Sequence, residues 1–153
     1  MSRYWDWAVE IHGREGVDAL LIRLQDGHDQ CVAYLLWAAW AAAQGRALDP
    51  VLLRQGAALA DHWEKAATAP LRHVRRELKA PAPPVDDEAR TALREQVRKA
   101  EFAAERLLME TLEELTPEDG SSVGLKDALV AASAAWRSRA PDAILADLAD
   151  RLG

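Results

Sequence analysis

The sequence has few residues of several kinds, and each shortage excludes a class of protein. Its single cysteine, Cys31, cannot form an internal disulfide, so we expect a reducing, cytoplasmic location. Glycine and β-branched residues are sparse, which disfavours β-sheets. The net charge of −6 argues against nucleic-acid binding, because neutralising phosphates requires a basic surface.

Long apolar runs and catalytic motifs are also missing. The most apolar run, Cys31 to Ala43, is too short to cross a hydrocarbon core of about 30 Å, so it predicts a buried helix and no membrane association. The four histidines never recur at a spacing of four, so we expect no metal site. Residues 120–124 match G-x-S-x-G, but no histidine follows Ser122. The sequence therefore predicts no catalytic residue, no cofactor and no enzyme.

What is abundant is alanine, leucine and tryptophan. Alanine and leucine favour helices, and we expect an all-α fold. Five of the six tryptophans lie in the first 63 residues, and each ring buries a large apolar area while its N–H needs a partner. We therefore expect these side chains to anchor one core: Trp5, Trp7, Trp37, Trp40 and Trp63.

Local signals place the helices. Ser2 and the pair Asp49-Pro50 are typical helix starts, and the acidic residues at 86–88 open a long helix over 87–115. Gly56 lies on an inward stripe, where it permits close helix approach. Pro70 is expected to end or kink its helix. The long helix should pack through a seam spaced by fours and threes: Leu93, Val97, Ala100, Ala104, Leu107, Thr111 and Leu115.

These elements predict a single helical bundle of about six to eight helices. The bundle domain spans 2–119 and has three parts: a Trp-rich half over 2–80, a Pro-rich linker over 81–85, and the long helix over 86–116. Three prolines in four residues favour an extended linker. We expect residues 120–153 to form a short helical C-terminal extension.

A basic segment supplies the main candidate binding residues, Arg72, Arg75, Arg76 and Lys79. Gln25 and Asp26 end an earlier apolar helix. In one interpretation, Asp26 pairs with an arginine and ties the two helices together, so that Asp26→Ala would cost about 3 kcal/mol if the pair is buried. In the other, the arginines stay partly free and bind a small anionic ligand, with Asp26, Gln25 and His62 as polar lining.

A second candidate surface is formed by Phe102 and Met109, seven residues apart on the side of the long helix opposite the seam. The basic segment 72–79 and the acidic segment 101–119 are also expected to bind each other, within the monomer or across a homodimer. We favour a non-enzymatic adaptor or regulator that engages another protein. The alternative is a binder of, or enzyme for, a small anionic ligand. Nucleic-acid binding through the basic helix is the weakest hypothesis.

The segments YWDWAVEIHGREGV, LLIRLQD, VAYLLWAAWAAAQG and W…PLRHVRREL, in this order, resemble a proteobacterial family catalogued as domain of unknown function 2390. The resemblance covers roughly Tyr4 to Lys79 well and the long helix more loosely. It implies a compact helical cytoplasmic protein and no assigned enzyme activity. The sequence departs from the family pattern at His12, where an aromatic residue is usual, and at Ala33, where a polar amide often lies.

Overall fold

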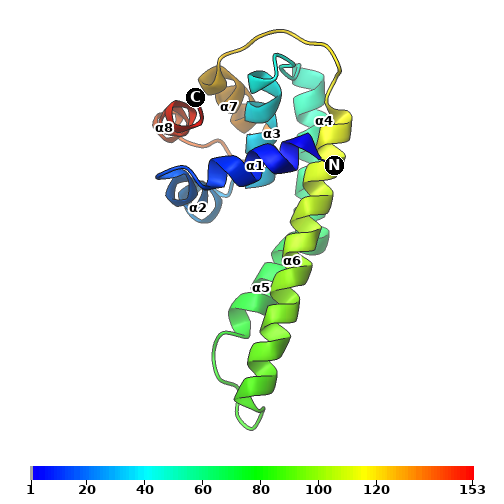
Figure 1. Ribbon diagram of the computed structural model, residues 1–153, viewed down its shortest axis with the longest axis vertical. Helices are drawn as coiled ribbons and strands as arrows, with labels where there is room; N and C mark the ends of the chain where they lie inside the picture. The colour runs from blue at the N-terminus through cyan, green and yellow to red at the C-terminus, as the bar shows by residue number, and fades with distance from the viewer. Residues whose placement is uncertain (1) are drawn as a thin grey trace.

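The computed structural model describes residues 2–153 and is all-helical in that range, which confirms the predicted fold class. A head contains most of the helices, and α5 and the long α6 form a hairpin that projects from it (Figure 1). The elements in chain order are α1 (Arg3–His12), α2 (Val17–His28), α3 (Val32–Ala43), α4 (Pro50–Trp63), the π-helix η1 (Glu64–Thr68), α5 (Ala69–Glu77), α6 (Asp87–Leu115), α7 (Leu125–Ala135) and α8 (Asp142–Leu152).

The predicted helix starts are confirmed by their capping bonds. Ser2, Asp49 and Asp86 each accept a hydrogen bond from the backbone N–H three residues later, at 3.1, 2.8 and 2.8 Å. Each bond satisfies one of the free N–H groups at the start of a helix. The Pro-rich segment 81–85 connects α5 to α6 at the far tip of the hairpin. It forms a turn, in which the N–H of Val85 donates to the carbonyl of Ala82 at 2.9 Å, and not the extended linker that its prolines favoured.

The chain continues in helical form through Pro70, although this residue was expected to end or kink its helix. The π-helix η1 joins α4 to α5 directly, and the N–H of Ala69 donates to the carbonyl of Glu64, five residues back. In a regular α-helix the proline ring would clash with the carbonyl four residues before it. The wider π-turn just before Pro70 changes the position of the preceding carbonyl groups relative to the proline ring. Glu64 and Thr68, the first and last residues of the π-helix, are both buried.

The tryptophan anchors are confirmed, with different degrees of burial. Trp37 and Trp40 are fully buried at the centre, whereas Trp5, Trp7 and Trp63 are partly buried against the core. The N–H of Trp37 donates to Thr116 Oγ1 at 2.8 Å, and that of Trp63 donates to the carbonyl of Ala104 at 2.8 Å. These bonds supply the hydrogen-bond partner that the N–H of a buried indole needs.

The C-terminal helices share this core, so the predicted division at residue 119 does not correspond to a division in packing. Leu129, Trp136, Leu145 and Leu148 are all buried in the same cluster as Trp37. The Tyr34 hydroxyl donates to the carbonyl of Ala132 in α7 at 2.9 Å. Residues 120–153 are therefore an integral part of the bundle.

The seam predicted for the long helix is wrong in its register. Leu93 and Leu107 were expected to face inward, but they are 48% and 54% exposed. Ala104 is buried as predicted, and the other buried residues of α6 are Glu101, Leu108, Met109 and Leu112. Glu101, which pairs with Arg72 and Arg75, is buried whereas Ala100 is exposed, so most of the buried face is rotated by roughly one residue from the predicted seam.

Gly56 permits the close approach that its position predicted. A Cβ at this residue would lie 2.2 Å from the Trp37 ring, which is fully buried. We therefore expect Gly56→Ala to lower the free energy of unfolding by about 2 kcal/mol, because overpacking outweighs the better helix propensity of alanine. Urea unfolding checks this, with Gly27→Ala as the control, since a Cβ there meets nothing within 4 Å. A stabilised Gly56→Ala protein would contradict this packing.

Candidate functional site

A cavity of about 220 Å³ lies where α2, α3, η1 and α6 meet, and His12 at the C-terminal end of α1 also lines it. Its apolar walls come from the buried side chains of Leu21, Leu36, Leu108 and Met109. His12, Asp18 and the half-exposed Ile22 form the rim on the solvent side. The cavity is therefore a pocket with an apolar interior and a polar opening.

One wall of this cavity is polar and comes from the π-helix and the start of α5. Glu64, Thr68 and Arg72 are spaced by four residues, so they line the same side of the continuous helix. Glu64 is 8% exposed and Thr68 only 2%. The Thr68 hydroxyl is buried and has no hydrogen-bond partner among the described residues. Glu105 of α6 lies across from this wall and, with Asp18 and Glu64, is one of three carboxylates in the lining.

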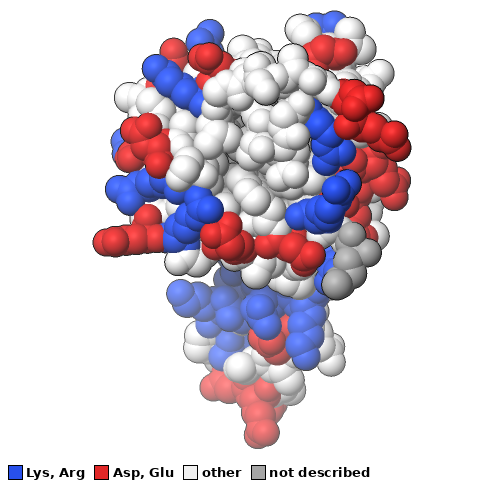
Figure 2. Space-filling model, turned by 45° about the horizontal axis from the view of Figure 1, so that its top comes forward, with Lys and Arg blue, Asp and Glu red and all other residues white. Residues whose placement is uncertain are grey.

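Arg72 belongs to an ion-pair cluster between α5 and α6. Its guanidinium lies 3.4 Å from Glu101 and 3.7 Å from Glu105, and Arg75 contacts Glu101 at 2.5 Å. The Glu101 side chain is buried between these two arginines and the helix that carries it. The basic and acidic segments therefore do pair, and they do so within the monomer. Figure 2 shows the basic residues gathered on the hairpin next to the head, with acidic residues at its far tip.

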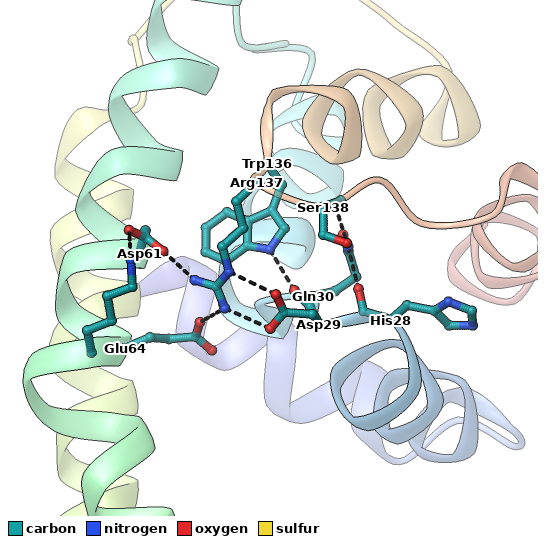
Figure 3. Close-up of polar contacts among 9 residues, drawn as sticks. His28, Asp29, Gln30, Asp61, Glu64, Trp136, Arg137 and Ser138 are labelled. Carbon is teal, nitrogen blue, oxygen red and sulfur yellow. Dashed lines mark hydrogen bonds and ion pairs between the residues drawn. The ribbon is translucent and has the colours of Figure 1, made fainter.

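Glu64 is held by a second cluster, centred on Arg137 just after α7 (Figure 3). The guanidinium binds both carboxylate oxygens of Asp29, at 2.8 and 3.0 Å, and also contacts Asp61 and Glu64, the latter at 3.2 Å. It also lies over the Trp136 ring, 4.6 Å from the centroid. This cluster fixes one oxygen of Glu64 from behind the cavity wall.

Burial and neighbouring charges shift several pKa values at the site. Burial raises the pKa of Glu64, although Arg137 and Arg72 partly offset this effect. The pKa of Glu105 is raised by burial and by the nearby Glu101 carboxylate. Behind Glu64, the hydrogen bonds from Arg137 lower the pKa of Asp29. At Glu64 and Glu105, the effect of burial on the pKa therefore outweighs the attraction of the nearby guanidinium groups.

The predicted pocket residues are only partly brought together. Gln25 and Arg72 line the cavity, whereas Asp26 and His62 are exposed and lie outside its lining. Asp26 pairs with Arg76 at 3.3 Å, with both side chains at least half exposed. The interpretation in which Asp26 forms a buried ion pair is therefore wrong. An exposed pair of this kind contributes under about 1 kcal/mol.

The remaining predicted residues are separated from one another. Lys79 is exposed near the end of the hairpin. Phe102 is 50% exposed and packs edge-on against Trp5, with ring centroids 5.0 Å apart. Met109 is buried and lines the cavity instead of extending a surface stripe. Phe102 and Met109 therefore do not form one exposed surface.

Sequence reasoning missed four residues that matter here, Glu64, Thr68, Glu105 and Arg137. The first two share a four-residue spacing with Arg72, and that spacing is the one signal in the sequence that links them. Arg137 joins the cluster only through the packing of α7. Within residues 2–153, no group of three or more His, Cys, Asp or Glu side chains is placed to hold a metal ion. No described helix combines the length and apolarity that a membrane crossing requires.

Comparison with known proteins identifies the family. A family model described as "Protein of unknown function (DUF2390)" matches residues 3–112, which is more than half of the chain. The chain therefore belongs to this family, as its motifs predicted. The match includes every residue that lines the cavity and ends before α7. No curated protein and no solved structure matches.

Proposed function

We propose that this member of the DUF2390 family binds a small, largely apolar molecule in the cavity between α2, α3, η1 and α6. The observation that carries this function is Thr68, a residue of the cavity lining whose buried hydroxyl has no hydrogen-bond partner within residues 2–153. Burying a hydroxyl without a partner costs free energy, and such groups in folded proteins call for a cause. A ligand that hydrogen-bonds Thr68 would supply the missing partner.

The size and lining of the cavity support a ligand of modest size. An apolar cavity of about 150 Å³ is enough to hold benzene, and this one measures about 220 Å³. Its mixture of apolar walls and a few polar groups is typical of small-molecule sites. Burial raises the pKa of the Cys31 thiol in the lining to about 12, so this residue stays protonated at neutral pH and is not a thiolate nucleophile. Binding is thus better supported than covalent catalysis.

Docking of another protein on the basic helix has weaker support. Arg72 and Arg75 pair with Glu101, and Arg76 pairs with Asp26. A partner would have to compete with these internal ion pairs for the same guanidinium groups. The adaptor hypothesis therefore ranks below ligand binding.

Titration of the ¹⁵N-labelled full chain with 2-phenylethanol tests the cavity. We expect saturable amide shifts concentrated in the cavity-lining parts of α2, α3, η1 and α6, with a Kd of roughly 1 mM or tighter, consistent with a ligand of this size. Ala33→Leu, which enlarges a side chain in the cavity wall, should weaken binding by about tenfold or more. Ala58→Leu, on the exposed side of α4, should leave it unchanged. Equal binding to both variants would place the probe elsewhere.

A further inference from the structure

We infer that the natural ligand of this cavity carries a primary ammonium group, which Glu64, Thr68 and Glu105 bind together. This inference rests on the proposed function and adds the charge and chemistry of the ligand. It differs from the anionic ligand expected from the sequence, because the structure uses the arginines for other contacts.

The charges around the cavity favour a cation. Its lining includes three carboxylates, those of Asp18, Glu64 and Glu105, and one guanidinium, that of Arg72. Arg72 is neutralised by the buried Glu101, which lies outside the lining. Each carboxylate has a partner, since His12 lies 2.6 Å from Asp18, Arg137 lies 3.2 Å from Glu64 and Arg72 lies 3.7 Å from Glu105. The carboxylates nevertheless outnumber the guanidinium groups of the lining, so the lining attracts a cation more than an anion.

The hydrogen-bonding groups match an ammonium in number. One oxygen of Glu64 accepts from Arg137, and the other makes no hydrogen bond within residues 2–153. The Thr68 hydroxyl has no partner in the described part of the chain, and Glu105 contacts Arg72 at 3.7 Å, beyond hydrogen-bond distance. A primary ammonium has three N–H donors, one for each of these acceptors. Its charge would also offset the raised pKa values of both carboxylates.

The lining distinguishes a primary amine from a quaternary one. Quaternary ammonium groups lack N–H donors and are recognised by the faces of aromatic rings. Among the described residues, no tryptophan, tyrosine or phenylalanine lines the cavity. The available groups are oxygen acceptors, which suit a group that donates hydrogen bonds.

Three probes of similar shape test this assignment by calorimetry on the full chain: 2-phenylethylamine, 2-phenylethanol and phenylacetate. We expect the amine to bind at least about tenfold more tightly than the alcohol, because charge-assisted hydrogen bonds are the stronger ones. Glu64→Gln should bring the amine-to-alcohol affinity ratio close to one. Glu88→Gln, which removes the same charge from the exposed start of α6, should leave the ratio unchanged. If Glu64→Gln does not fold, Thr68→Val serves instead, since it removes an unpartnered hydroxyl without changing shape, and it should lower the ratio about threefold.

The possible outcomes distinguish the proposed small-molecule cavity from the proposed ammonium site. Tightest binding of the amine, lost with Glu64→Gln, supports the ammonium site. Equal binding of amine and alcohol, or tightest binding of phenylacetate, overturns the ammonium assignment and leaves a cavity that binds small molecules. Absence of binding by all three probes overturns both. If the amine-to-alcohol affinity ratio falls as much with Glu88→Gln as with Glu64→Gln, the preference for the amine comes from the net charge of the protein. That result would also overturn the ammonium site.

Discussion

A chain that ends at Glu118 is expected to lose its cooperative fold, although the family model covers only residues 3–112. The truncation removes Leu129, Trp136, Leu145 and Leu148 from the core and exposes their packing partners. Each large apolar side chain contributes about 1.5–3 kcal/mol when fully buried. Together they approach the roughly 5–15 kcal/mol that stabilises a typical domain. Thermal unfolding followed by circular dichroism checks this result.

Two point variants, one at a buried tryptophan and one at a partly buried tryptophan, serve as controls for the size of the deletion. Trp136→Ala removes a ring that is 6% exposed and an N–H bond to the carbonyl of Asp29, so we expect a loss of about 4 kcal/mol. Trp7→Ala removes a tryptophan that is only partly buried, and its loss should be smaller. If the truncated chain unfolds cooperatively with the midpoint of the full chain, α7 and α8 are accessory and the single-core description is incorrect.

Glu101→Gln is expected to lower the free energy of unfolding by about 3 kcal/mol, because it leaves two partly buried guanidinium groups without their shared carboxylate. Arg72 and Arg75 are only 14% and 24% exposed in their side chains, so water compensates poorly for the lost charge. The substitution keeps the shape of the side chain, and the effect therefore reports on charge. Urea unfolding at neutral pH measures it.

Glu95→Gln is the matched control for this variant. Glu95 lies on the same helix and pairs with Arg98 at 2.7 Å, but both side chains are about half exposed. Exposed ion pairs of this kind contribute at most about 1 kcal/mol. Equal losses for the two variants would show that the Glu101 cluster is solvated and does not hold α5 against α6.

Helix positions could be predicted because their signals are local. Asp49 with Pro50, and Asp86 before an acidic first turn, act on backbone groups within three residues, so they need no tertiary contact. The tryptophans predicted a core for a similar reason, since an indole gains free energy from burial in almost any helical packing.

Two features could not be predicted from local signals: which face of α6 is buried, and the continuation of the helix through Pro70. Residue 101 is buried because Arg72 and Arg75 neutralise it, and sequence periodicity treats a glutamate as a surface residue. A proline usually ends a helix, and only the π-helix before Pro70 allows continuation. The cavity could not be predicted from the sequence for the same reason, because its walls come from helices that are far apart in the chain.

The most direct test is a crystal structure of the full chain grown with 2-phenylethylamine. We expect the phenyl ring among Leu21, Leu36 and Leu108, and the nitrogen within about 3.2 Å of Glu64 and Thr68. Electron density for the amine only on the outer surface, with the cavity filled by protein side chains, would contradict the proposed function.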